Sequence, residues 1–144
     1  IFITDKAPLI NLSEDKVNVL WIEYDNQSST RGLNPALYAE ALGQADFCIC
    51  PLGWGGNWTH RVPESLLRGA IPVLEDEKRY NIGLEDMENC LTAKSGNWAK
   101  VIKKAYELDS EKVRNMRLNI LSLRERYLLP KAAASRLRKS IGLK

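Results

Sequence analysis

The fold is decided by residues 45–76, which read ADFCICPLGWGGNWTHRVPESLLRGAIPVLED. The segment opens with a short, continuously apolar run at residues 45–51, a pattern typical of a strand covered on both faces. A glycine-containing loop follows, and residues 63–68 then suit a helix that Gly69 should end. A second apolar run at residues 71–74 predicts another strand. Two strands joined by a helix over about 30 residues predict a parallel βαβ unit with a right-handed crossover.

The remaining sequence supplies helices and one further strand. Residues 17–24 (VNVLWIEY) are β-branched and aromatic, which predicts a buried strand. Residues 35–43 begin with proline and predict a short helix. From residue 97 onward the apolar residues recur at helical spacing, with new helices expected at Ser110 and Pro130. The predicted class is therefore α/β: a Rossmann-like parallel sheet flanked by helices, with a helical C-terminal segment, in a single domain of 144 residues.

Composition is that of an ordinary domain, with 44% hydrophobic and 27% charged residues. The formal net charge of +3 decides little about partners. Much of the basic excess lies in the last third of the chain, at Arg124, Arg126, Lys131, Arg136, Arg138, Lys139 and Lys144. These side chains could contact nucleic acid or an anionic membrane, but an ordinary solvated helix face is the favoured interpretation. We therefore expect no nucleic-acid partner.

The cysteines indicate neither a metal site nor a disulfide framework. Cys48 and Cys50 alternate with apolar residues, so their thiols should share one face of a strand, and Cys90 stands alone. With one histidine and no paired Cys-x-x-Cys motif, buried reduced thiols in a reducing compartment are the simplest explanation. No segment approaches the length of a transmembrane helix, and the first residues lack signal-peptide features. The chain also lacks an initiator methionine, which suggests a fragment of a longer protein.

The glycine-rich loop is the predicted ligand site. In an open parallel sheet, ligands bind beyond the carboxyl ends of the strands, where the first strand of the βαβ unit leads into this loop. Glycines allow the backbone to approach a ligand closely, and the free N–H groups of the next helix attract phosphate. A tight turn without a ligand is the alternative. The loop residues are Gly53, Trp54, Gly55, Gly56, Asn57 and Trp58.

Side chains around this loop extend the predicted site. Trp54 and Trp58 should either pack on the core or offer a face to a planar base or a sugar ring. Arg61 and Glu64 lie three residues apart on one helical face, so a cation for phosphate and an acceptor for sugar hydroxyls could reach the same crevice. A surface ion pair between them is the rival explanation. His60 could bond a phosphate or act as a base, and a capping or exposed imidazole is the alternative.

These residues resemble a known family. The run ADFCICPLGWGGNWTHRVPESLLRGAIPVLEDE is similar to the C-terminal half of exostosin-type glycosyltransferases. The shared pattern is an apolar strand ending in Cys-x-Pro, a glycine-containing loop, Arg-x-x-Glu, and Gly-x-Ile-Pro-Val followed by an acidic residue. A short strand at Leu91 and a helix beginning with tryptophan also look like that family. The close match covers about a quarter of the chain.

The resemblance implies the donor-binding half of a two-domain GT-B enzyme. Glu64 would accept hydrogen bonds from donor hydroxyls, Arg61 would offset diphosphate charge, and the backbone of residues 53–57 would approach the phosphates. The partners would be a nucleotide-sugar donor, a glycan or other acceptor, and a missing N-terminal domain, without which the chain would be inactive. No catalytic residue, metal or other cofactor is assigned. A bacterial or viral relative would be cytoplasmic, and a eukaryotic one would work in the Golgi lumen.

One alternative from another functional class stays open. A non-catalytic α/β module that binds a nucleotide or a partner protein would also explain the chain, with Trp54 and Trp58 as an exposed aromatic patch.

Overall fold

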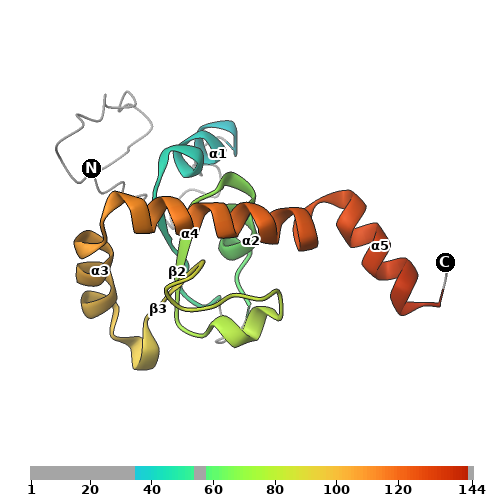
Figure 1. Cartoon of the computed structure of the whole chain (residues 1–144). Coiled ribbons are helices and arrows are strands. Elements are labelled where there is room, and N and C mark those ends of the chain that lie inside the picture. The colour runs from blue at the N-terminus through green and yellow to red at the C-terminus, as the bar shows by residue number, and fades with distance from the viewer. Residues whose placement is uncertain (1–34, 54–57, 143–144) are drawn as a thin grey trace, which may run out of the picture. The chain divides into compact units, whose positions relative to one another are not determined.

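The computed structural model describes residues 35–53 and 58–142. The strand predicted at residues 17–24 lies outside them. The chain divides into two compact units, Ile1–Tyr38 and Ala39–Lys144. The second unit contains the sheet, and the single-domain organisation stays a prediction. The elements in chain order are α1 (Pro35–Gln44), β1 (Phe47–Ile49), α2 (Arg61–Arg68), β2 (Ile71–Leu74), η1 (Glu77–Tyr80), β3 (Leu91–Thr92), η2 (Lys94–Gly96), α3 (Trp98–Glu107), α4 (Ser110–Leu123), η3 (Arg124–Leu128) and α5 (Pro130–Ser140) (Figure 1).

The sheet has three strands in the order β1-β2-β3, and both pairings are parallel. Phe47 is opposite Ile71 across the first pair, and Val73 is opposite Leu91 across the second. With α2 between β1 and β2, the predicted βαβ unit is confirmed. The fold is a Rossmann-like α/β arrangement, a parallel sheet flanked by helices, as the sequence predicts.

The central strand β2 tolerates Pro72 because the position of its missing N–H is not used in the ladder to β1. All four residues of β2 are buried. The ladder to β1 uses Ile71, whose N–H donates to Asp46, and Val73, whose carbonyl accepts from Cys50. Pro72 therefore faces the β3 side, where pairing begins only at the next residue. No hydrogen bond of the ladder to β1 is lost.

The strand β1 is less covered than its apolar run suggests. The sheet order leaves β1 at the edge of the described strands, and the side chain of Ile49 is 45% exposed. The expectation that both faces of this strand are covered is wrong at Ile49. A continuous apolar run is typical of a central strand, but here the central position belongs to β2.

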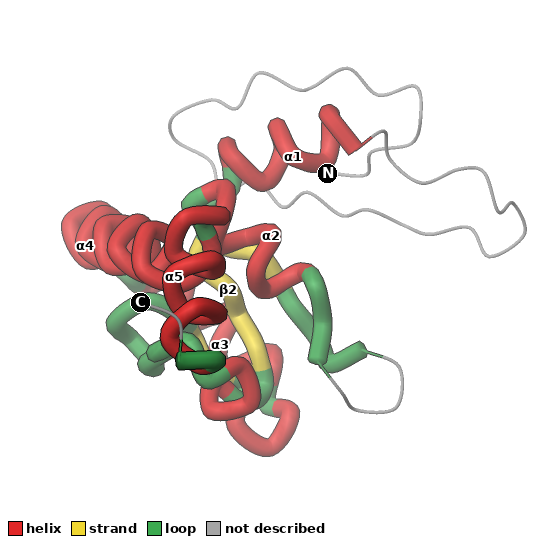
Figure 2. Tube along the Cα trace, turned by 90° about the vertical axis from the view of Figure 1, so that its right-hand side faces the viewer, coloured by secondary structure: helices red, strands yellow, loops and turns green. Residues whose placement is uncertain are grey.

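Two helices cover the buried strand. The residues of α2 that face inward are Val62, Ser65 and Leu66, and α2 packs on β2. Met116 and Ile120 of α4 are fully buried, and α4 contacts both β2 and α2. In Figure 1 α4 crosses in front of α2, and Figure 2 shows α2 next to the yellow strand β2.

The C-terminal segment is helical, as predicted. The π-helical turn η3 follows α4, and Pro130 begins α5. Figure 1 shows α5 leading away from the sheet, and none of its residues is buried. No helix in the described part of the chain is both long and apolar enough to cross a membrane.

Candidate functional site

The described part of the predicted site lies between the end of β1 and the first turn of α2. Gly53 follows β1 as a half-buried loop residue, and Trp58 is 57% exposed. Between them, Trp54, Gly55, Gly56 and Asn57 lie outside the described residues. The contribution of the glycine-rich loop itself therefore stays a prediction.

The helix α2 begins at Arg61 with His60 as its N-cap residue, so Thr59 and His60 lie near its start, as the sequence predicts, and Pro63 lies in its first turn. Proline is tolerated there because the first N–H groups of a helix have no partner within it. The capping oxygen comes from Thr59, which is buried and accepts a hydrogen bond from the backbone N–H of Arg61 at 3.4 Å. His60 occupies the N-cap position, is exposed, and makes no side-chain capping bond. Gly69, with φ of 79°, ends the helix in the left-handed conformation, as predicted.

Arg61 and Glu64 both lie in the first turn of α2, next to the end of β1. Arg61 is exposed and Glu64 is partly buried. Among the residues that the structure describes, no salt bridge joins Arg61 to Glu64. Both charges act on Cys48: Arg61 lowers the pKa of its thiol and Glu64 raises it. The two side chains thus share the surroundings of the carboxyl end of β1.

Tyr80 lies beside the predicted site and is not among the residues predicted from the sequence. It ends η1, the short 3-10 turn that follows β2, and it is buried. Its hydroxyl accepts a hydrogen bond from the backbone N–H of Thr59 at 3.4 Å, and its ring contacts the ring of Trp58. Desolvation raises the pKa of the Tyr80 hydroxyl. The run Glu77–Tyr80 is mostly charged, so nothing in it signals that this one side chain turns inward.

Two cysteines at the end of β1 contact a serine of α2. The Cys48 and Cys50 thiols share one face, as predicted, with their sulfur atoms 3.7 Å apart. The Cys50 sulfur is also 3.4 Å from the hydroxyl of Ser65 on α2. The hydrogen bond from Cys50 lowers the pKa of Cys48, whereas that same bond and burial raise the pKa of Cys50. These three side chains connect β1 to α2 below the predicted site.

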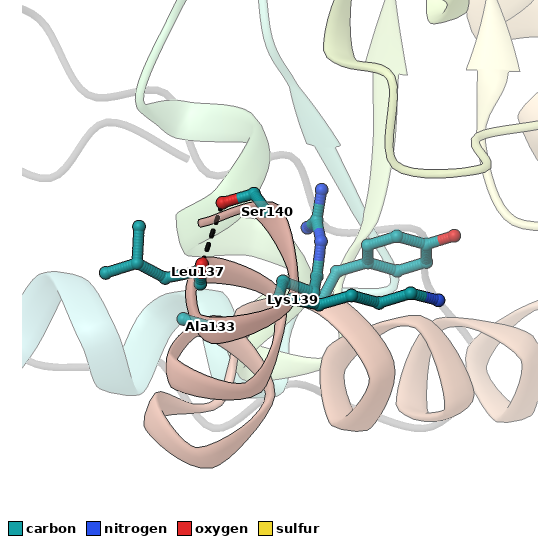
Figure 3. Close-up of a pocket in the computed structure, with 6 residues that line it drawn as sticks. Ala133, Leu137, Lys139 and Ser140 are labelled. Atoms are coloured by element: carbon teal, nitrogen blue, oxygen red, sulfur yellow. Dashed lines mark hydrogen bonds between the residues drawn. The ribbon is translucent and has the colours of Figure 1, made fainter. Parts of the chain in front are cut away.

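Two other kinds of binding site are a metal site, which the described residues do not form, and a surface pocket, which lies outside the predicted site. Among the described residues no group of three or more His, Cys, Asp or Glu side chains could hold a metal ion. An open pocket lies at the C-terminal helices (Figure 3). It is lined by Tyr127, Ala133, Arg136, Leu137, Lys139 and Ser140, none of which belongs to the predicted site. The guanidinium groups of Arg126 and Arg136 lie 5.2 and 4.8 Å from the centre of the Tyr127 ring, so part of the basic cluster is held on an aromatic side chain.

Comparison with known proteins finds similarity over a short segment. No protein-family model matches the chain, and no solved structure matches it. Over 41 residues, 28% of this chain, it is 46% identical to a protein of Oryza sativa subsp. japonica named "Probable glucuronosyltransferase" and to "Probable glucuronosyltransferase 47 A" of Physcomitrium patens. The same length is 44% identical to a "Probable beta-1,4-xylosyltransferase" of Arabidopsis thaliana. The matches span about a tenth of these relatives' own length. More than a quarter of this α/β chain is thus similar in sequence to plant glycosyltransferases.

Proposed function

We propose that the chain is the donor-binding part of an exostosin-like, GT-B glycosyltransferase and that it binds a nucleotide-sugar. The observation that carries the proposal is the parallel βαβ unit, which places Arg61 and Glu64 in the first turn of α2 at the carboxyl end of β1. Ligands of open α/β sheets bind at this edge. The similarity to plant glycosyltransferases supports the same reaction class.

Each site residue has a chemical role in this proposal. The exposed guanidinium of Arg61 pairs with the diphosphate, and the helix dipole adds to the positive potential there. Glu64 accepts hydrogen bonds from ribose or sugar hydroxyls. The backbone of residues 53–57 approaches the phosphates, His60 bonds a phosphate oxygen, and Trp58 offers its exposed face to a planar ring. Stabilisation of the leaving diphosphate then comes from cationic side chains and the helix terminus, without a bound metal.

Catalysis requires a second half in this proposal. The acceptor and the catalytic base are supplied by a further domain that closes over the donor, so this chain alone binds the donor without transferring the sugar. The complete protein has a glycan or related hydroxyl compound as its acceptor.

Calorimetric titration with nucleoside diphosphates tests the donor site. Arg61→Ala should weaken binding of the preferred nucleotide about tenfold or more, because it removes a charge-assisted hydrogen bond of about 1.5–3 kcal/mol. Glu64→Gln should also weaken binding, provided that the ligand retains its ribose.

Arg68→Ala is the matched control, because Arg68 is an exposed arginine in the last turn of the same helix. It should bind the nucleotide within about twofold of wild type. If no common nucleoside diphosphate binds, or if the three variants behave alike, the donor-site assignment is wrong.

The exposed Trp58 favours a second candidate, a non-catalytic module that binds a nucleotide or a partner protein. Sugar transfer by the complete protein separates the two functions. Nucleotide-sugar hydrolysis or transfer that is lost in Arg61→Ala supports the enzyme, and nucleotide binding without turnover in the complete protein supports the module.

A further inference from the structure

Cys48, Cys50 and Ser65 form a polar cluster that the proposed donor site does not use. Apart from its 3.7 Å contact with Cys48, the Cys50 thiol lies 3.4 Å from the Cys48 carbonyl oxygen and 3.4 Å from the Ser65 hydroxyl. The Ser65 hydroxyl in turn donates to the carbonyl oxygen of Arg61, one helical turn earlier. The cluster therefore joins the end of β1 to the turn that carries the proposed phosphate-binding arginine.

The two thiols differ in burial and in hydrogen bonding, so they should differ in how readily they act as nucleophiles. Cys50 is fully buried, and its thiol can donate to the Cys48 sulfur at 3.7 Å or to the Cys48 carbonyl oxygen at 3.4 Å, whereas Cys48 is only half-buried. A thiol that accepts a hydrogen bond near an arginine has a larger fraction of thiolate, which is the nucleophile in cysteine chemistry. Glu64 is the nearby opposing charge, and it acts more weakly on Cys48 than Arg61 does. Cys48 is thus the attacking thiol and Cys50 the resolving one.

We propose that Cys48 and Cys50 are a reversible oxidation site that closes to a disulfide by exchange with a low-molecular-weight disulfide such as oxidised glutathione. The Cys48 thiolate attacks one glutathione sulfur, and the glutathione disulfide bond breaks to release one glutathione thiolate, which takes up a proton. The Cys50 thiol then attacks the Cys48 sulfur, and its proton passes to the second glutathione sulfur as that thiol leaves. One protein disulfide forms as one glutathione disulfide is reduced to two thiols.

The geometry makes closure feasible but strained. Residues two apart in an extended strand have Cα atoms about 6.6 Å apart, close to the upper limit of about 6.8 Å that a disulfide spans. Closure must also bring the two sulfur atoms from 3.7 Å to about 2.0 Å, so we expect the backbone of Cys50, whose N–H donates to Val73 at 2.8 Å, to shift toward Cys48. Strained disulfides are readily reduced, which makes the site reversible.

Mass spectrometry of the whole chain after incubation with oxidised glutathione tests the site. The expected product has lost two hydrogens, and differential alkylation places the loss at Cys48 and Cys50 with Cys90 still a thiol. Glutathione in its reduced form should reverse the change. A stable glutathione adduct on the wild-type chain, a disulfide that includes Cys90, or no reaction would each overturn the proposal.

Three variants separate the roles of the thiols. Cys50→Ser should stop at a stable glutathione adduct on Cys48, because the resolving thiol is gone. Cys48→Ala should neither gain glutathione nor lose hydrogens at Cys50. Cys90→Ser is the matched control, because it removes a buried cysteine outside the cluster and should oxidise as wild type does. Failure of the control to oxidise, or closure in either of the other variants, would contradict the assignment.

A second measurement needs no substitution and so does not depend on the variants folding. Phenylarsine oxide bridges two neighbouring thiols, and it should bind the reduced wild-type chain with one-to-one stoichiometry and block subsequent loss of hydrogens. Absence of binding would show that the two sulfur atoms cannot act together.

The oxidation has an expected consequence for ligand binding, which rests on the proposed function. Because closure moves the end of β1 beneath Arg61, the oxidised chain should bind a nucleoside diphosphate several-fold more weakly than the reduced chain. Equal affinity of the two forms would show that oxidation does not affect nucleotide binding. The mass measurement would still test whether Cys48 and Cys50 are oxidised. If neither form binds a nucleotide, the proposed function fails and the oxidation site is judged by mass alone.

Discussion

The ring of Trp58 rests on the ring of Tyr80, with their centroids 6.1 Å apart and their planes inclined by 40°. Trp58 is 57% exposed, whereas Tyr80 is buried. In the proposed donor site, the exposed ring of Trp58, packed against the buried ring of Tyr80, is the surface offered to a planar ligand. The pair joins the loop before α2 to the turn after β2, at the edge of the sheet where ligands of this architecture bind.

Trp58→Leu should therefore separate binding from stability. Nucleoside diphosphate affinity should fall about threefold to tenfold, the range expected for one lost aromatic contact. The free energy of unfolding should change by less than about 1 kcal/mol, because most of the indole is in solvent. Calorimetry and urea unfolding measure the two quantities. Unchanged affinity would exclude Trp58 from the binding surface.

Tyr80→Phe should have the opposite profile. The substitution keeps the ring beneath Trp58 but leaves the buried backbone N–H of Thr59 without its acceptor. Loss of such a partner costs about 1 to 2 kcal/mol. Urea unfolding should show this loss, with nucleotide affinity within about twofold of wild type. A neutral effect on unfolding would mean that the 3.4 Å bond contributes nothing to stability.

Gly69→Ala should destabilise the chain by about 1 kcal/mol, because Gly69 has φ of 79°. The added Cβ would lie 3.8 Å from Arg117, an ordinary contact, so the expected loss comes from the backbone alone. Gly43→Ala is the matched control: Gly43 lies in α1 with open space around it, and alanine there should be neutral or stabilising. Thermal unfolding of the two variants compares them directly. Equal effects would contradict the conformational explanation.

The sequence predicts the βαβ unit well because its signals are local. Each signal depends only on residues that are adjacent in the sequence. These signals are the two apolar runs, Gly69 as helix terminator and the helical spacing beyond residue 97. The start of α2 is fixed only approximately by the sequence, because proline is compatible with any position in a first helical turn. The exposure of Ile49 is misjudged because strand order decides it, and strand order depends on contacts distant in sequence.

The candidate site is only partly visible from sequence for the same reason. Arg61, Glu64 and Trp58 follow the glycine-rich loop directly, so their placement at the end of β1 comes with the unit. Tyr80 lies near these residues only because β2 and η1 bring it next to Thr59, which is distant in sequence. The residues Glu77–Tyr80 show no periodicity that predicts this contact. A tyrosine among charged residues therefore looks like part of a solvated turn.

Asn89 is expected to hold together the acidic loop before β3. It is buried, accepts a hydrogen bond from the Glu85 N–H at 2.8 Å, and donates to the Gly83 carbonyl at 3.1 Å. Asn89→Ala should cost about 1 to 3 kcal/mol, because both backbone groups lose a partner. Asn89→Asp keeps the acceptor for the Glu85 N–H but places a buried carboxylate oxygen against the Gly83 carbonyl oxygen, so at neutral pH it should cost at least as much as alanine. Urea unfolding ranks the variants, and a smaller loss for Asn89→Asp than for Asn89→Ala would show that the bond to Gly83 contributes little.

Cys90 gives the chain an expected loss of stability at alkaline pH. Burial raises the pKa of its thiol from 9.0 to about 12. Above pH 9 the unfolded chain releases this proton while the folded chain retains it, so the unfolded state binds fewer protons and the free energy of unfolding falls as pH rises. One such group contributes a slope of up to about 1.4 kcal/mol per pH unit. Cys50 and Tyr80, whose pKa values are also raised, act in the same direction, while Cys48, whose pKa is lowered, acts in the opposite one.

The Cys90→Ala variant isolates this contribution. Urea unfolding of wild type and variant between about pH 8 and pH 10.5 should give a flatter dependence for the variant, because its unfolded state no longer loses the Cys90 proton. The absolute stabilities differ because alanine leaves a small cavity, so the slopes are the quantities to compare. Parallel slopes would mean that the buried thiol ionises as readily in the folded chain as in the unfolded one. That result would contradict the burial of the Cys90 side chain in the core.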